Sequence, residues 1–150
     1  MPRKTLIVYY SKSKKSETVA HKLQGKLGCD MDKLGYADKE RISFFAAGKE
    51  ALKKAIVTIK GDAHNPADYE HLIFISPVWA SALSTPIRSY MAQHKTSIKS
   101  YSLIAVCGGS GLEGCINDAV KVLGNAPERS EQYLAAKVAK DDYDVGKFVG

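Results

Sequence analysis

The sequence predicts an α/β protein with an open parallel sheet of five strands in the order 2-1-3-4-5 and helices on both faces. Short β-branched and aromatic runs alternate along the chain with segments whose apolar residues recur at helical spacing. The run at 72–78 is apolar almost throughout, as expected for a strand buried on both faces of a parallel sheet. The length of 150 residues fits a single domain, 1–150.

The first half of the chain begins with a predicted strand at 5–10 and a helix at 16–27, whose apolar residues share one face. Gly28 is placed to end this helix. A second short strand is predicted around Asp30–Leu34. The stretch 42–60 is left open between a helix and a helix followed by an irregular strand.

The second half contains the clearest strand, 72–78, which Pro77 is expected to end. Thr85 and Pro86 then predict a helix start, with a capping hydroxyl followed by proline at the first helical position. Such strand, helix, strand units form right-handed crossovers between parallel strands. The ligand crevice of such a sheet lies where the winding reverses, between strands one and three.

The end of the chain predicts a fourth strand at Tyr101–Cys107, then a helix closed by Gly124. A fifth strand is predicted near Tyr133–Val138. Only residues 141–150 follow, enough for at most a truncated helix, so one sheet face is expected to be poorly covered. An uncovered face favours a homodimer or another partner.

Hydroxyl groups and lysines fill the loop after the first strand. Its hydroxyls converge with the N–H groups at the start of the next helix, where the helix dipole favours an anion. The sequence therefore predicts a phosphate-binding loop, and a solvated turn with a serine N-cap is the alternative. The residues of this loop are Ser11, Lys12, Ser13, Lys14, Lys15 and Ser16.

The second candidate loop holds the one tryptophan of the chain, within the run Pro77, Val78, Trp79 and Ala80. Placed beyond a strand end, the indole is expected to face the crevice, where it can stack on a flat ring. The alternative is that Trp79 is an ordinary core residue.

The third candidate loop contains Cys107, Gly108, Gly109 and Gly111, and its glycines allow the main chain to approach a ligand closely. A flexible turn is the alternative. Gly109, Gly111 and Gly114 match the spacing of a dinucleotide fingerprint, but we discount it because the motif follows the wrong strand and lacks a convincing acidic partner.

Composition excludes several classes of function. The net charge of +6 is concentrated in the first half of the chain and fits an anionic ligand, an acidic partner or plain solubility. No nucleic-acid motif, metal-ligand spacing or membrane segment stands out, so we expect a cytoplasmic protein without a metal. The three cysteines lack paired spacing and are expected to be reduced. No acid, base or nucleophile is predicted to be catalytic.

Together, the three loops resemble those of the flavodoxin family in its short-chain form, over nearly the whole chain. The resemblance implies a flavodoxin-like fold and noncovalently bound FMN, with electron transfer to and from redox partner proteins, a reductase and an acceptor. It also implies phosphate contacts from Ser11, Ser13 and Ser16, Trp79 against the flavin ring, and the backbone of Gly108 and Gly109 near the ring's pyrimidine edge.

Two lysines depart from the family pattern. Lys14 and Lys15 stand where the family usually has glycine and asparagine, so a positive φ at Lys14 would be strained. Two other hypotheses stay open beside the electron carrier: an FMN-dependent NAD(P)H:quinone oxidoreductase, and a flavodoxin-like binding module without flavin.

Overall fold

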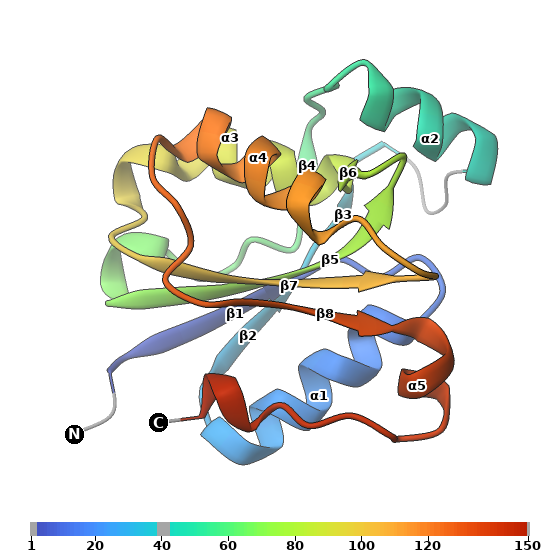
Figure 1. Ribbon diagram of the computed structural model, residues 1–150. Coiled ribbons are helices and arrows are strands. Elements are labelled where there is room, and N and C mark those ends of the chain that lie inside the picture. The colour runs from blue at the N-terminus through green and yellow to red at the C-terminus, as the bar shows by residue number, and fades with distance from the viewer. Residues whose placement is uncertain (1–2, 39–42, 150) are drawn as a thin grey trace.

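The computed structural model describes residues 3–38 and 43–149. Five parallel strands lie in the order β2-β1-β5-β7-β8, so the predicted strand order is confirmed (Figure 1). The strands are β1 (Thr5–Tyr9), β2 (Asp30–Lys33), β5 (His71–Trp79), β7 (Tyr101–Cys107) and β8 (Ser130–Leu134).

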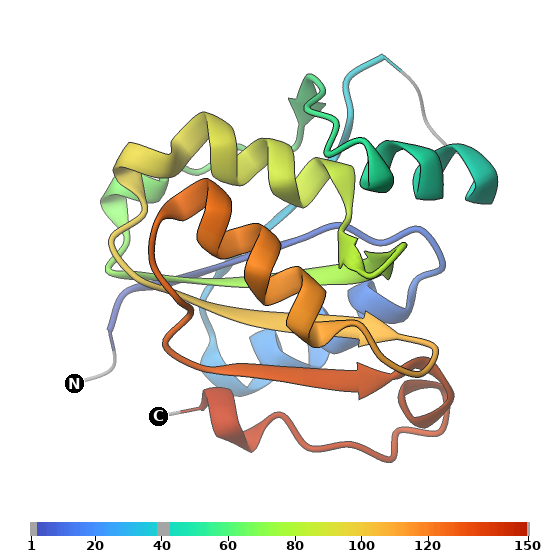
Figure 2. The same ribbon diagram turned by 45° about the horizontal axis from the view of Figure 1, so that its top comes forward.

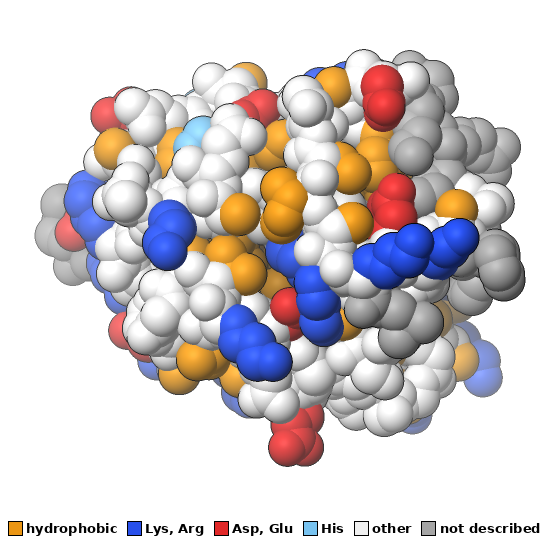
Figure 3. All heavy atoms as spheres, turned by 90° about the horizontal axis from the view of Figure 1, so that it is seen from above, with side chains coloured by type: hydrophobic (Ala, Val, Ile, Leu, Met, Phe, Trp, Pro, Cys, Tyr) orange, Lys and Arg blue, Asp and Glu red, His pale blue; other side chains and the backbone are white. Residues whose placement is uncertain are grey.

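Helices cover both faces of this sheet, as predicted (Figures 1 and 2). On one face lie α2 (Phe44–Leu52), α3 (Thr85–His94) and α4 (Leu112–Leu123); on the other lie α1 (Lys15–Leu27) and α5 (Ala135–Ala139). Seen from the side of α2, α3 and α4, lysine and arginine side chains form several separate groups among apolar and uncharged ones (Figure 3).

The alternation of side chains along the strands builds one core on each face. In β1, Leu6 and Val8 belong to the core under α3 and α4, whereas Ile7 and Tyr9 belong to the core under α1. All four side chains are at most 2% exposed. Burial on both faces is the reason why the central strands show continuous apolar runs.

The stretch left open at 42–60 contains α2 and, after a loop, the short strand β4 (Ile59–Lys60). Residue 42 lies outside the described part of the chain. Strand β4 pairs antiparallel with β3 (Gly35–Tyr36), a small second sheet that the sequence did not predict. Two residues per strand are too few to give a periodic pattern.

The ends of the helices follow the predicted chemistry at two places and differ at one. Gly28 and Gly124 adopt the left-handed conformation and end α1 and α4. The N-cap of α3 is Ser84 rather than Thr85, and Pro86 stands in the first turn as expected. The Ser84 side chain makes no capping bond; it pairs with Ser76 Oγ at 3.0 Å.

The prediction that Pro77 ends its strand was wrong. Strand β5 continues to Trp79, and Pro77 pairs in register with Val106 of β7. Along β5, Leu72 N–H donates to the carbonyl of Ser100, just before β7, while the Ile75 carbonyl accepts from the N–H of Tyr10, just after β1. Pro77 therefore turns its missing N–H toward β1, which has already ended, and no ladder bond is lost.

The last strand was also predicted at the wrong place. It comprises Ser130–Leu134, and the predicted range Tyr133–Val138 runs instead into α5. Leu134 is paired with Cys107, the last residue of β7, so a longer strand would have no partner. Alanine and lysine after Leu134 favour a helical turn once the ladder is finished.

The segment after α5 covers the sheet face that we expected to be exposed. It forms a 3₁₀ turn at Gly146–Phe148, and Val145 and Phe148 are buried in the core under α1. The specific argument for a homodimer through this face therefore falls away, and a homodimer stays a prediction. Within 3–38 and 43–149, no helix has the length and apolar content needed to cross a bilayer.

A buried carboxylate fastens the loop before β5 to the edge strand β2. Asp32 is 2% exposed, and it accepts hydrogen bonds from the backbone N–H of His64 at 3.1 Å and from His64 Nδ1 at 2.6 Å. The hydrogen bond to Asp32 raises the pKa of His64 above its usual value of 6.5. Because the folded state binds this proton more tightly, the pair stabilises the fold most when His64 is protonated.

We expect the stabilisation by His64 to be complete below pH about 6 and to be lost as the pH rises through the raised pKa. The substitution H64A should therefore lower the free energy of unfolding more at low pH than at high pH. The difference should be below about 1 kcal/mol, because the imidazole is 39% exposed and water screens the pair. Urea unfolding at several pH values measures it. In a D32N background the pH dependence of the H64A effect should vanish, and its persistence there would contradict the pairing.

Candidate functional site

The three loops singled out in the sequence meet in one pocket of about 220 Å³. The pocket lies at the carboxyl ends of β1, β5 and β7. After β1 the chain adds β2 on one side of it and then β5 on the other, so the winding reverses here. A doubly wound sheet binds ligands at such a reversal. The lining residues are Lys12, Ser13, Lys15, Ser16, Pro77, Val78, Trp79, Val106, Cys107, Gly108 and Ala135.

The first loop carries its strain at Lys14. Lys14 is the N-cap residue of α1 and adopts φ 68° and ψ −1°, the left-handed region that glycine prefers. Its carbonyl accepts the first helical bond, from Thr18 N–H at 3.0 Å. The alternative of a serine N-cap was therefore wrong, and no side chain caps the N-terminus of α1.

Donor groups gather around the same loop. The first N–H groups of a helix have no partner within the helix, so those of α1 remain available to a ligand. Ser11 Oγ is buried without a hydrogen-bond partner in the described structure. Ser16 is 2% exposed and its side chain lines the pocket. An unpartnered buried hydroxyl is costly unless something binds it.

The charge of the pocket wall is positive. Lys12 and Lys15 line the pocket, and no aspartate or glutamate is among its lining residues. Lys14 is not part of the wall; its contribution is the bend of the backbone. Two ammonium groups, serine hydroxyls and a helix N-terminus form a set of donors suited to a phosphate group.

Trp79 is placed differently from the prediction. It is the last residue of β5, not a residue beyond the strand, and its side chain is 7% exposed. The indole packs edge to face against Tyr10, with the ring centroids 5.5 Å apart and the planes at 89°. Trp79 is thus largely a core residue, as the alternative interpretation had it, although it still forms part of the pocket wall.

A tight hairpin follows Trp79. Strand β5 pairs antiparallel with β6 (Ala82–Leu83), and the two turn residues, Ala80 and Ser81, have φ of 51° and 59°. Such a two-residue turn normally contains glycine or asparagine. Ala80 does not line the main pocket; it lines a neighbouring hollow of about 50 Å³ together with Val78 and Trp79.

A buried ion pair fixes this hairpin. Arg88 on α3 and Asp118 on α4 are 1% and 4% exposed, and Arg88 Nε lies 3.1 Å from Asp118 Oδ2. Asp118 accepts the backbone N–H of Leu83 at 3.2 Å, and Arg88 Nη2 donates to the Leu83 carbonyl at 3.0 Å. Both backbone groups of Leu83 are therefore held by charged side chains that the sequence analysis did not single out.

Two glycines let α4 approach the hairpin closely. A Cβ at Gly111, where φ is 132°, would lie 2.4 Å from Val78 Cγ1. A Cβ at Gly114 would lie 1.8 Å from the carbonyl oxygen of Ser81. Gly111 was predicted to face a ligand, and the structure instead gives it a packing role between the second and third loops.

The third loop reaches the pocket through Cys107 and Gly108. Cys107 is 5% exposed, and burial raises the pKa of its thiol. All three cysteines are free. Gly109 does not line the pocket, although neither it nor Gly108 has any atom near the position that a Cβ would take.

The pocket thus contains most of the predicted residues and two that were missed. Ser11, Lys14, Ala80, Gly109 and Gly111 were predicted and do not line it. Val106 and Ala135 line it and were not predicted. Ala135 was missed because its segment was expected to continue the last strand. Val106 carried no signal beyond that of an ordinary strand residue.

Comparisons with known proteins agree on the fold. No family model matches the chain, and no curated protein sequence matches it. A flavoprotein of Lactobacillus acidophilus, solved in complex with FMN, superposes with a TM-score of 0.78 at 19% identity, covering 93% of this chain and 98% of that one.

Two further solved structures are similar. The apo form of the Lactobacillus acidophilus flavoprotein gives a TM-score of 0.69 at 19% identity, over 93% and 97% of the two chains. A flavodoxin from the domain Archaea gives 0.53 at 15% identity, over 97% and 98%. These similarities, with the strand order and the position of the pocket, show that the chain has the flavodoxin-like fold.

Arg88 and Asp118 should stabilise the fold only when both are present. We expect D118L to lower the free energy of unfolding by about 3–5 kcal/mol, because it leaves the Arg88 guanidinium buried without its carboxylate. The double variant R88M/D118L should be more stable than D118L, since it also removes the stranded charge. Urea unfolding followed by circular dichroism measures both. A double variant no more stable than D118L would show that the charges are not coupled.

The strain at Lys14 gives a second prediction. The variant K14G should raise the free energy of unfolding by about 0.5–1 kcal/mol, because glycine adopts φ 68° without steric conflict. The matched control K15G removes the same charge from a residue in ordinary helical conformation and should lower stability by up to about 0.5 kcal/mol. Thermal unfolding compares the two. Equal effects of both substitutions would mean that Lys14 is unstrained.

Proposed function

We propose that this chain binds FMN in the pocket between the three loops and serves as an electron-transfer protein. The observation that carries the proposal is the composition of the pocket wall: lysines and hydroxyls from the loop after β1 on one side, Trp79 and the backbone of Gly108 on the other. A phosphate and a flat apolar ring need these two kinds of surface.

The first loop would hold the phosphate. The Ser11 hydroxyl lacks a partner but does not line the pocket, so it would donate to a phosphate oxygen only after a shift of the loop. Lys12 and Lys15 would supply positive charge, and the first N–H groups of α1 would supply further donors. The residues present therefore fit the phosphate of FMN. The two lysines add positive charge that a loop with serine side chains alone would lack.

The second and third loops would hold the flavin ring. Trp79 and Val78 offer apolar surface at one side of the pocket, while Gly108 allows close approach of the main chain. A volume of about 220 Å³ is below the range usual for cofactor pockets, so part of the ring would extend beyond it. The tight burial of Trp79 means that stacking on a ring face would require the β5–β6 hairpin to shift.

Bound FMN would supply the one- and two-electron redox chemistry. The chain would bind and orient the flavin and set its electrostatic surroundings. No carboxylate or histidine lines the pocket, and burial raises the pKa of the Cys107 thiol, so the lining side chains are poorly suited to move protons at neutral pH. This favours a carrier that exchanges electrons with a reductase and an acceptor over an oxidoreductase that is self-sufficient. The similarity to an FMN-bound flavoprotein supports the cofactor.

Titration with FMN and with riboflavin tests the proposal. We expect FMN to bind much more tightly than riboflavin, and the substitution K15Q to weaken FMN binding roughly tenfold while leaving riboflavin binding unchanged. The control K26Q removes an exposed lysine from the other end of α1 and should change neither. Trp79, the one tryptophan in the chain, should lose fluorescence as the flavin binds.

The outcomes separate the three hypotheses. Equal affinity for FMN and riboflavin would contradict the phosphate site, and no binding of either at micromolar concentration would favour a flavin-free binding module. If FMN binds, oxidation of NAD(P)H with a quinone and without added reductase would favour the oxidoreductase. The electron carrier predicts no such turnover unless a reductase is present.

A further inference from the structure

A row of polar side chains crosses the sheet at the end opposite the flavin pocket. Thr5 of β1 pairs in register with His71 of β5, and Ser102 of β7 pairs with Ile73, two residues further along. All three polar side chains lie on the face toward α1, because side chains two residues apart along a strand share a face. The remainder of that face is apolar, formed by residues such as Ile7 and Ile104.

Hydrogen bonds determine which ring nitrogen of His71 carries the proton. The residue is 3% exposed. Ser100 Oγ donates to the carbonyl of Glu70 at 3.0 Å, so it can only accept from His71 Nδ1, at 2.7 Å. The other ring nitrogen, Nε2, must then accept from Ser102 Oγ at 2.9 Å. Burial, together with nearby Arg3 and Arg129, lowers the pKa of His71 to about 4, against the opposing effect of Glu128, whose Oε2 lies 3.4 Å from Nδ1. His71 is therefore neutral at pH 7 and its hydrogen bonds are satisfied.

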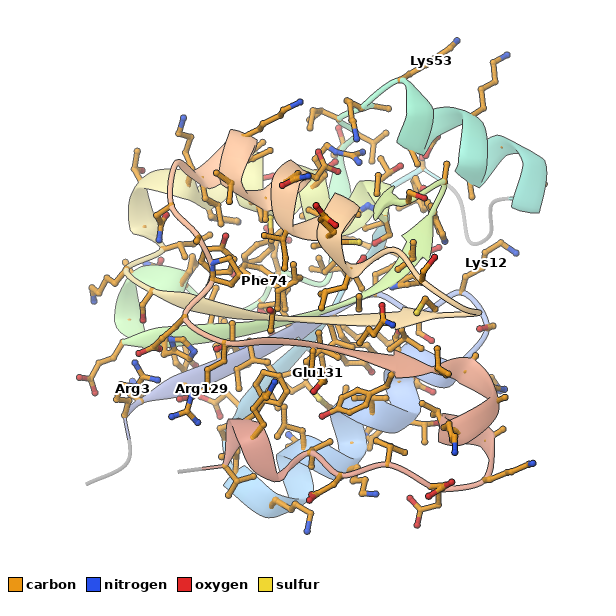
Figure 4. The ribbon with its side chains drawn as sticks, viewed as in Figure 1. Arg3, Lys12, Lys53, Phe74, Arg129 and Glu131 are labelled. Carbon is orange, nitrogen blue, oxygen red and sulfur yellow. The ribbon has the colours of Figure 1, made fainter. Side chains whose placement is uncertain are left out.

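A second pocket, of about 100 Å³, opens over this row. Arg3 and Arg129 both line it and lie at the same end of the strands, opposite Lys12 at the flavin end (Figure 4). Apolar side chains complete the wall between the end of α1 and the C-terminal turn. The lining residues are Arg3, Thr5, Leu27, Cys29, His71, Ile73, Ser102, Arg129 and Phe148.

The guanidinium groups of Arg3 and Arg129 use only some of their N–H donors in hydrogen bonds within the protein. Arg3 Nη1 lies 2.9 Å from Glu128 Oε2 in an exposed ion pair, which contributes little in water. Arg129 Nη1 donates to the backbone carbonyl of Lys147. Each guanidinium carries five N–H donors, so both retain donors for a ligand. With His71 neutral and one nearby carboxylate at Glu128, two arginines leave the mouth of the pocket positive.

We propose that this second pocket binds a small carboxylate with a short apolar chain. The arginines fit the planar carboxylate group, for which their fork of donors is matched. Leu27, Ile73 and Phe148 fit the apolar chain, and the volume limits it to a few carbon atoms. A bound carboxylate would compete with Glu128 for Arg3. Because Phe148 lines the pocket, the ligand would contact the C-terminal turn, which covers this face of the sheet.

Titration of the full chain with butyrate, followed by NMR of backbone amides and of the histidine rings, tests this inference. We expect saturable shifts at millimolar butyrate that include Arg3, Arg129 and His71, and a rise in the pKa of His71 when the anion is bound. The substitutions R3Q and R129Q should each weaken binding about tenfold. The control K137Q removes an exposed charge elsewhere and should have no effect.

Three results would overturn the inference: shifts that never saturate, shifts that R129Q leaves unchanged, or binding of inorganic phosphate in place of butyrate. The unfolding free energy of each variant, measured in parallel, separates loss of the site from loss of the fold. Because the two pockets share no lining residue and lie at opposite ends of the strands, butyrate binding can be measured whether or not the chain binds FMN.

Discussion

The buried ion pair between Arg88 and Asp118 is the interaction on which the candidate site depends. It joins α3 to α4 and holds both backbone groups of Leu83. Leu83 pairs with Val78, so the pair also fixes the end of β5 that forms one wall of the pocket. A charged pair inside a core often contributes no more to stability than apolar packing would; here its hydrogen bonds to the backbone of Leu83 favour one geometry of the hairpin.

Strained backbone surrounds the same pocket. Lys14, Ala80 and Ser81 all adopt positive φ without being glycine, and they belong to the first two of the three loops that meet there. Strain of this kind persists only where the surrounding structure holds it, and it is common at binding sites. In the second loop the holding groups are the ion pair and the close approach of Gly111 and Gly114. In the first loop, the start of α1 already holds Lys14 at positive φ, and a bound phosphate would stabilise this conformation further.

The parts of the fold that could be predicted are those that depend on local pattern. The alternation of apolar strands and helical segments predicted the strand order, and the serines after β1 and the glycines after β7 predicted the end of the sheet where the pocket lies. The end of β5, the burial of Trp79 and the helix at Ala135 depend on which strands are present as neighbours, and single segments carry no such signal. The link between Arg88 and Asp118 spans 30 positions and could not be found without the fold.

A crystal structure of the protein grown with FMN tests the central claim most directly. Our account predicts the phosphate between the first amides of α1 and the side chains of Lys12, Ser13, Lys15 and Ser16, with the flavin ring extending toward Trp79 and Gly108. Flavin bound with its phosphate away from this loop, or the pocket unchanged and empty at saturating FMN, would contradict it.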